Sequence, residues 1–192
     1  MRPLILASTS PYRRSLLGRL QLPFECARPG VDEAHVAGEA PASRALRLSL
    51  AKAQAVARAH PQAIVIGSDQ VAEAAGAVLD KPGDADRCRD QLARLSGGTA
   101  QFHTGCAVVG VEAGLQLQHV DTTVVTFRRL TPEEIDRYVQ AERPFDCAGG
   151  FKSEGLGITL FERIDSSDPT ALIGLPLIWL AAALRQAGYR LP

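Results

Sequence analysis

The stretch LILASTSPYRRSLL, residues 4–17, sets the pattern of the fold. Its apolar start, within residues 3–7, is typical of a short buried strand. Ser10 and Pro11 then indicate a helix start, because serine accepts hydrogen bonds from free backbone N–H groups and proline suits the first helical position. We therefore expect a strand, a polar turn and a helix that ends near residue 20.

Helices and strands alternate along the rest of the chain. We expect further helices at residues 41–59, 84–95, 131–141 and 176–187, and strands at residues 24–27, 63–67, 101–111 and 115–127. We also expect a polar loop at residues 30–39, a hairpin around Gly76 at residues 71–79, and an extended, glycine-punctuated segment at residues 147–164. Such alternation with one antiparallel pair indicates an α/β or α+β fold with a mixed sheet.

The composition is that of a folded protein without a general affinity for polyanions. The 192 residues are 46% hydrophobic, and 21 Lys and Arg residues balance 21 Asp and Glu residues. This argues against disorder, a nucleic-acid polymer as partner and a basic membrane anchor. The apolar runs are too short for a signal-peptide core or a membrane span, so we expect a cytoplasmic protein. The four cysteines form no CxxC pair, and we expect scattered, buried free thiols.

The segment from Ser8 to Arg14 is the first candidate for chemistry. Residues 1–24 carry four arginines and no acid, and Arg13 and Arg14 fall in the first turn of the predicted helix. Cations are unfavourable there because the helix N-terminus already carries a partial positive charge. A bound phosphate would offset these charges. Alternatively, the two arginines point to solvent or pair with distant acids.

Asp69 is the second candidate, because it comes just after the apolar strand at residues 63–67. Side chains at this edge of an α/β sheet often face a ligand crevice, where a carboxylate can hold a divalent cation or activate water. The alternative is a turn or N-cap aspartate. Glu33, Lys52 and Lys81 could each be a solvated surface residue, but together with Asp69 they supply the mixture of charges that phosphate chemistry needs.

Residues 149–157 form a glycine-rich stretch in which the backbone could approach a ligand closely. The stretch is neither a P-loop nor a GxGxxG motif, so a plain loop stays an alternative. The four histidines lack the spacing of a zinc hydrolase and no GxSxG motif occurs.

These constellations together resemble the Maf family of nucleotide pyrophosphatases over nearly the whole chain. The matching segments are, in order, LILASTSPYRR (residues 4–14), VDE (31–33), KA (52–53), IGSDQ (66–70), KP (81–82) and FKSEG (151–155). The resemblance implies an α/β fold with a mixed, elongated, twisted sheet flanked by helices, similar to that of the inosine triphosphate pyrophosphatases. It also implies a homodimer and one domain over residues 1–192, which a central cleft could divide into two lobes.

The resemblance further implies hydrolysis of a nucleoside triphosphate to the monophosphate and pyrophosphate, with Mg²⁺ or Mn²⁺ as cofactor. Asp69 matches the family's proton acceptor, and Glu33 matches an acid that we place near the metal or the attacking water. Lys52 and Lys81 are then catalytic cations, while Ser8, Arg13 and Arg14 bind phosphate. Attack of water on the α-phosphorus needs no covalent intermediate.

Tyr12, Gln70 and Glu154 match the positions at which branches of the family differ in the base they bind. FKSEG resembles the branch that acts on 7-methyl-GTP, whereas the dTTP and UTP branch has Gln at the position of Glu154. Guanine presents two adjacent N–H donors to a carboxylate, and N7-methylation makes its ring cationic. Tyr12 could stack on that ring, although relatives in this branch often have Trp there. The alternative role of Glu154 is a salt bridge, for example to Lys152.

We expect a house-cleaning pyrophosphatase for 7-methyl-GTP. The same reaction on dTTP, UTP or other modified nucleotides is the first alternative. A nucleotide-binding regulator of septum formation is the second.

Overall fold

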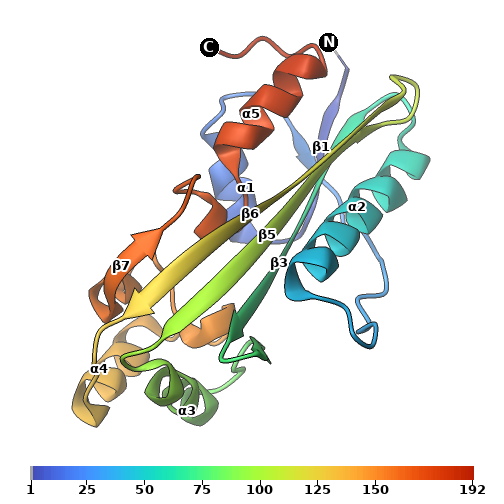
Figure 1. The fold of residues 1–192 in the computed structure, drawn as a ribbon. Coiled ribbons are helices and arrows are strands. Elements are labelled where there is room, and N and C mark those ends of the chain that lie inside the picture. Colours follow the sequence, from blue (N-terminus) through green and yellow to red (C-terminus); the bar gives the residue numbers. More distant parts are fainter. Residues whose placement is uncertain (1) are drawn as a thin grey trace. The chain divides into compact units, whose positions relative to one another are not determined.

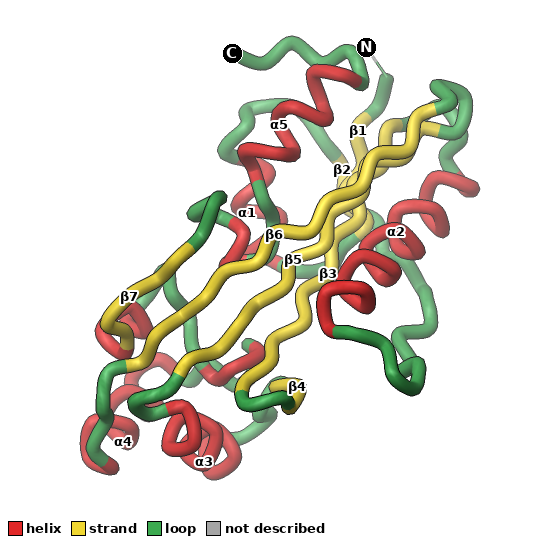
Figure 2. The backbone as a smooth tube through the Cα atoms, viewed as in Figure 1, coloured by secondary structure: helices red, strands yellow, loops and turns green. Residues whose placement is uncertain are grey.

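The computed structural model describes residues 2–192, and its strands form one mixed sheet. In the order β2-β1-β3-β5-β6-β7, the strands are β2 (Glu25–Cys26), β1 (Leu4–Ala7), β3 (Ile64–Ala74), β5 (Thr99–Gly110), β6 (Leu115–Phe127) and β7 (Phe161–Asp165). The first three are parallel, β7 is antiparallel to β6, and β4 (Ala77–Leu79) is antiparallel to β3. Figure 2 shows these strands in yellow. The predicted mixed α/β sheet flanked by helices is confirmed.

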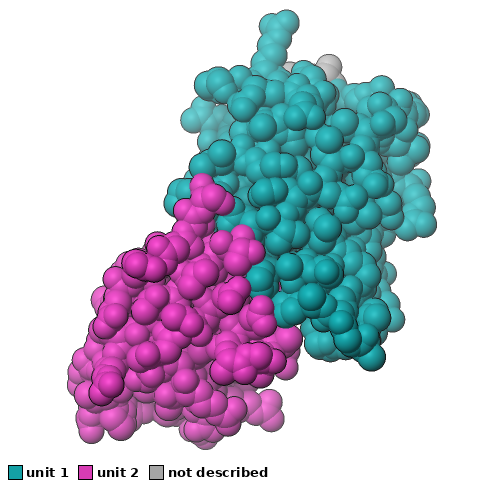
Figure 3. Space-filling model, in the orientation of Figure 1, with its two compact units in different colours: residues 1–70, 103–121, 168–192 teal, residues 71–102, 122–167 magenta. Residues whose placement is uncertain are grey.

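The chain divides into two compact units, coloured teal and magenta in Figure 3. Unit 1 consists of residues 1–70, 103–121 and 168–192, and unit 2 of residues 71–102 and 122–167. Strands β3, β5 and β6 contribute residues to both units. The expected single domain with a central cleft stays a prediction.

Unit 1 has a core on each face of its part of the sheet, because successive side chains of a strand point to opposite faces. Leu4 and Leu6 of β1 join the core formed with α1 (Pro11–Gly18) and α5 (Leu177–Gln186). Ile5 and Ala7 join the core formed with α2 (Pro41–Ala59). Figure 1 shows α1 and α5 on one side of the strands and α2 on the other.

Helix α2 lies in direct backbone contact with two strands, because each offers a glycine at the crossing. A Cβ atom on Gly67 would lie 2.1 Å from the carbonyl oxygen of Ser49, and one on Gly105 would lie 2.2 Å from that of Ala45. Both distances are far below a possible contact, so any larger residue would push the helix away. The two glycines thereby fix the depth at which α2 sits on the sheet.

Unit 2 is held together by aromatic packing and by two helices, α3 (Ala85–Leu95) and α4 (Pro132–Glu142). The rings of Phe102, Phe127, Phe151 and Phe161 pack edge to face, with centroids 4.8 to 5.7 Å apart. Helix α4 begins with a complete capping box between Thr131 and Glu134.

The structure confirms the predicted helix at residues 41–59 and the hairpin around Gly76, and it corrects three expectations. Strand β3 continues to Ala74, so Asp69 lies inside the strand; the end of the strand pairs with β4. Residues 147–164 are not simply extended, since they contain the 3₁₀ turns η1 (Ala148–Gly150) and η2 (Leu156–Leu160). Two of the four cysteines are not buried: Cys26 is exposed, because β2 is the short edge strand of the sheet, and Cys147 is half-buried.

Every helix within the described residues is too short or too polar to cross a membrane.

Candidate active site

Parallel pairing of β1 with β3 places Ser8 level with Ser68, the residue before Asp69. Ala7 is in register with Gly67, so Ser8 follows its strand where Ser68 continues the neighbouring one. Ser8 is buried, and its Oγ accepts a hydrogen bond from the backbone N–H of Ser10, the N-cap of α1. The first turn of α1 contains no acidic residue, as the sequence indicated.

Lys52 joins the two predicted acids in one cluster. Its Nζ lies 2.6 Å from Oδ1 of Asp69 and 2.9 Å from Oε1 of Glu33. The side chains of Lys52 and Asp69 are only 8% and 10% exposed, whereas that of Glu33 is 55% exposed. A buried ammonium and a buried carboxylate each need the other, because an unpaired charge in the interior is costly. We call Lys52, Asp69 and Glu33 the charged cluster.

Helix α2 fixes both sides of the charged cluster. It carries Lys52, and its close contact with Gly67 brings that lysine to the strand that carries Asp69. Two of its arginines hold the loop that carries Glu33: Arg44 donates to the carbonyl oxygen of Glu33, and Arg47 to that of Ala34, each at 3.4 Å. The loop before α2 is therefore ordered against the helix.

Arg13 and Ser68 meet at one carbonyl group. Nε of Arg13 and Oγ of Ser68 donate hydrogen bonds to the backbone oxygen of Gly174, at 2.9 and 2.8 Å. Burial lowers the pKa of Arg13 from its ordinary value, and the nearby carboxylate of Asp69 acts in the opposite direction. Arg13 is thus a positioned cation rather than a freely solvated one.

Gln70 is fixed by the same part of the chain. Its side-chain nitrogen donates to Oγ1 of Thr104 and to the carbonyl oxygens of Ala171 and Leu172, at 2.9 to 3.2 Å. The last two acceptors belong to the 3₁₀ turn η3 (Ala171–Ile173). Because the protein already engages the amide N–H groups of Gln70, a direct contact with a base would be made by the side-chain oxygen of Gln70.

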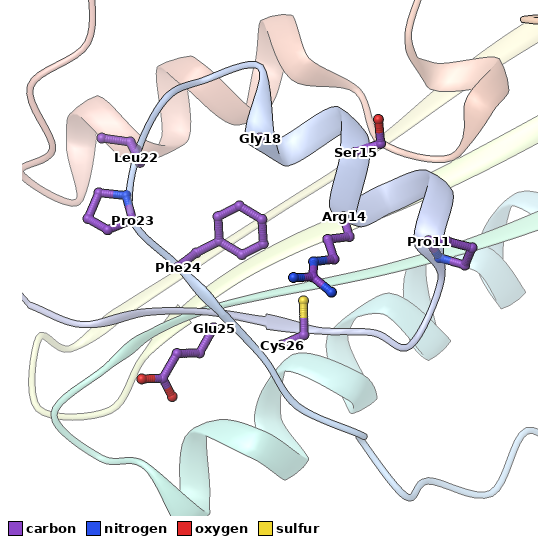
Figure 4. Close-up of a pocket in the computed structure, with 9 residues that line it drawn as sticks. All are labelled: Pro11, Arg14, Ser15, Gly18, Leu22, Pro23, Phe24, Glu25 and Cys26. Atoms are coloured by element: carbon purple, nitrogen blue, oxygen red, sulfur yellow. The ribbon is translucent and has the colours of Figure 1, made fainter.

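Arg14 has different surroundings from Arg13. It lines a surface groove between α1 and the segment that leads into β2, together with Pro11, Ser15, Gly18, Leu22, Pro23, Phe24, Glu25 and Cys26. Figure 4 shows its guanidinium group extending toward the thiol of Cys26. Tyr12, the residue before this arginine pair, is half-buried.

Lys81 and Glu154 belong to unit 2, whereas the other predicted site residues belong to unit 1. Both are exposed, Lys81 after β4 and Glu154 just before η2. The alternative salt bridge from Lys152 to Glu154 is not what the structure has, because Lys152 pairs with Glu142 instead, at 3.6 Å. Oε2 of Glu154 accepts a hydrogen bond of 3.5 Å from Oγ of Ser153.

Comparisons with known proteins show the family of the chain. The family model described as Maf-like protein matches residues 3–187. The chain belongs to the Maf family. A 7-methyl-GTP pyrophosphatase of Xanthomonas axonopodis pv. citri is 56% identical over 100% of both chains. One of Cupriavidus pinatubonensis is 54% identical over 97% of this chain and 94% of its own.

A solved structure, that of the Staphylococcus aureus Ham1 protein, covers 66% of this Maf chain and 71% of its own, with a TM-score of 0.43 and 15% identity.

The donor set of this Maf chain fits a metal that substrate helps to bind. Within residues 2–192, no three His, Cys, Asp or Glu side chains come close enough to form a metal site by themselves. Asp69 and Glu33 are the two carboxylates that Lys52 brings together. Mg²⁺ is commonly bound by one or two carboxylates together with substrate phosphates. The carboxylates of the charged cluster therefore suit a metal that the substrate phosphates also bind, and not a metal bound by protein side chains alone.

Sequence reasoning missed two residues that hold predicted site residues, or their neighbours, in place. The carbonyl oxygen of Gly174 accepts hydrogen bonds from Arg13 and Ser68. Every residue type has such a carbonyl group, so the sequence does not predict this contact. Glu142 is an ordinary acid at the end of α4, and only the fold brings it to the turn that carries Glu154. Neither residue has a spacing signal in the sequence.

Proposed function

We propose that this chain is a nucleoside triphosphate pyrophosphatase that converts 7-methyl-GTP and water to 7-methyl-GMP and pyrophosphate. The full-length relatives that carry the name 7-methyl-GTP pyrophosphatase support the substrate class. In the proposed reaction, the water oxygen forms a bond to the α-phosphorus. The bond from that phosphorus to the bridging oxygen of the β-phosphate breaks, and pyrophosphate leaves with the electron pair.

The observation that carries the proposal is the charged cluster. A general base must be fixed in position and within hydrogen-bond reach of the reacting water, and a carboxylate can serve as one. Lys52 holds Oδ1 of the buried Asp69 at 2.6 Å, so the second carboxylate oxygen is oriented to take the proton from water. Lys52 also keeps Asp69 and Glu33 together.

The cations of the site bind the triphosphate chain of the substrate. Charge builds on the bridging and non-bridging oxygens during the reaction, and fixed positive groups lower its energy there. Arg13 is positioned by Gly174 for such a role, with Ser8 and the free N–H groups of α1 beside it in sequence. We assign Arg14 and Lys81 to the same task from the family resemblance.

Asp69 and Glu33 are the residues that would hold Mg²⁺ or Mn²⁺, which would supply charge neutralisation at the phosphate oxygens when bound. The two carboxylates would also repel the phosphates of the substrate until a cation compensates their charge, because like charges repel.

Glu154 is our proposed base reader. Its exposed carboxylate can accept the N1–H and 2-amino hydrogens of guanine, and the cationic ring of 7-methylguanine strengthens that attraction. Lys152 is engaged by Glu142, which leaves the charge of Glu154 for the substrate. Tyr12 would stack on the ring, and Gln70 would act near the base through its oxygen or through η3.

The test is pyrophosphate release with Mg²⁺ or Mn²⁺ from 7-methyl-GTP, GTP, dTTP, UTP, CTP and ATP. We expect 7-methyl-GTP to be preferred and the Asp69→Asn variant to lose activity by about 100-fold or more. Preference for dTTP or UTP would keep the reaction and refute the base assignment. Tight binding of nucleotide without pyrophosphate release would favour a regulator of cell division.

The proposal also includes a house-cleaning role, a cytoplasmic location and a homodimer. Fractionation of cells tests the location, and sedimentation of the purified protein tests the homodimer, both independently of catalysis.

A further inference from the structure

The turn that carries Glu154 is tied to helix α4 by one carboxylate. We call residues 152–157 the Glu154 turn. Oε2 of Glu142 accepts a hydrogen bond of 2.8 Å from the backbone N–H of Leu156. The same side chain pairs with Nζ of Lys152 at 3.6 Å. Glu142 therefore contacts the chain on both sides of Glu154.

Tyr138, one turn earlier on α4, makes a third attachment. Its hydroxyl oxygen accepts a hydrogen bond of 3.1 Å from the backbone N–H of Lys152. Tyr138 is buried, and burial raises its pKa above the ordinary value, so the hydroxyl stays neutral. Residues 138 and 142 are four apart and lie on the same face of the helix. That face thus holds the Glu154 turn.

The turn has little room to rearrange. A Cβ on Gly155 would lie 2.7 Å from Oε2 of Glu142, and a Cβ on Gly157 would lie 2.3 Å from the carbonyl oxygen of Lys152. Within the turn, the N–H of Gly155 donates to that same Lys152 oxygen at 3.3 Å. The glycines let the turn fold tightly against itself and against Glu142.

Helix α4 is itself a rigid support. Its capping box is complete, and Arg128 holds Glu134 with two hydrogen bonds of 2.9 and 3.0 Å. Ile135 and Val139 are buried in unit 2. The backbone around Glu154 is thus fixed to a firm element, while the Glu154 side chain itself is exposed.

The ion pair between Glu142 and Lys152 also protects the charge of Glu154. Lys152 stands two residues from Glu154, and without Glu142 its flexible ammonium could turn to the other carboxylate. An ammonium on Glu154 would compete with a cationic base. Glu142 prevents this by engaging Lys152 elsewhere.

We propose that Glu142, assisted by Tyr138, is a specificity-determining positioning residue that fixes the Glu154 turn and keeps Lys152 away from Glu154. The proposal rests on the proposed function, because it takes Glu154 as the base reader.

The experiment is a double-mutant cycle of Glu142→Ala and Glu154→Gln, with KM and kcat measured on 7-methyl-GTP and UTP. We expect Glu142→Ala to raise KM for 7-methyl-GTP about tenfold, as for loss of one charge-assisted contact. We expect kcat on this substrate and both constants for UTP to change less than about twofold. In the Glu154→Gln background, Glu142→Ala should have no further effect, because the residues act as a unit.

Two more variants separate positioning from stability. Glu134→Gln is the matched control, since Glu134 is also an ion-paired acid on α4 that binds a backbone N–H, but lies at the other end of the helix. It should lower the unfolding temperature without changing KM. Lys152→Met added to Glu142→Ala should recover part of the lost preference, because the competing ammonium is gone. Glu142→Gln serves where Glu142→Ala does not fold.

Equal losses on 7-methyl-GTP and UTP, or additive effects of the two substitutions, would overturn the proposal. Failure of the proposed function looks different: the parent enzyme would show no preference for 7-methyl-GTP, or Glu154→Gln would change nothing. Amide hydrogen exchange gives a readout that does not depend on activity. Exchange at Leu156 should become faster in Glu142→Ala and stay unchanged in Glu134→Gln; unchanged exchange in both would refute the attachment.

Discussion

The ammonium group of Lys52 lies 2.6 Å from Oδ1 of Asp69, and both side chains are about nine-tenths buried. Helix α2 reaches the strand closely enough for this contact only because position 67 is glycine. The pair therefore joins the packing of the fold to the chemistry of the site. Substitutions in either residue should disturb both.

Lys52→Met should destabilise the protein as well as inactivate it. It leaves the carboxylate of Asp69 buried without its ammonium, which costs about 3 kcal/mol of unfolding free energy. Urea unfolding measures that loss. Replacing both residues, as Lys52→Met with Asp69→Leu, should restore most of the stability but no pyrophosphate release. A double variant as unstable as the single one would show that the ion pair itself stabilises the fold.

Gly67→Ala should weaken both folding and catalysis. The new methyl group would overlap the carbonyl oxygen of Ser49, so α2 must move and carry Lys52 with it. Overpacking of this kind costs about 1–3 kcal/mol. Gly18→Ala is the control, because a Cβ there meets nothing within 4 Å. Thermal unfolding and activity of the two variants should differ clearly; equal behaviour would argue against the close packing of α2.

Glu134 should make stability depend on pH in the acid range. Its hydrogen bonds with Arg128, and then with the backbone of Thr131, lower its pKa in the folded state below the ordinary 4.5. A lowered pKa stabilises the fold above the unfolded-state value, and this contribution disappears as pH falls through the folded-state pKa. Parent and Glu134→Gln should thus differ in urea midpoint at pH 7 and converge in acid. A difference that grows on acidification would contradict this linkage.

The cysteines should differ sharply in reactivity. Burial raises the pKa of Cys88 to about 11, and burial also raises the pKa of Cys106, whereas Cys26 is exposed. Because the thiolate is the reactive form, a thiol reagent at pH 7 should modify Cys26 quickly and reach Cys88 and Cys106 only on unfolding. Peptide mapping identifies the modified sites, with Cys26→Ser as the control. Fast labelling of Cys106 in the folded protein would be inconsistent with its position in the core.

The sequence predicts well where local patterns decide the structure. Helix α2 begins and ends as predicted, since Pro41 marks its first turn and its apolar residues follow the helical period. The extent of β3 could not be read from the sequence, because the polar residues after Gly67 interrupt the apolar pattern while pairing with β4 continues the strand to Ala74.

The candidate site depended on contacts that only the fold creates. Lys52 and Asp69 are 17 residues apart, and no local pattern joins a helix position to a strand position at that separation. The family resemblance marked both residues, but not their contact. It also left out Glu142 and the carbonyl of Gly174, which act by holding other groups.

The most direct measurement is hydrolysis of 7-methyl-GTP with Mg²⁺ in water labelled with ¹⁸O, followed by mass spectrometry of both products. The account predicts one ¹⁸O atom in 7-methyl-GMP and none in pyrophosphate, because water attacks the α-phosphorus. Label in pyrophosphate, or no release of pyrophosphate at all, would contradict it.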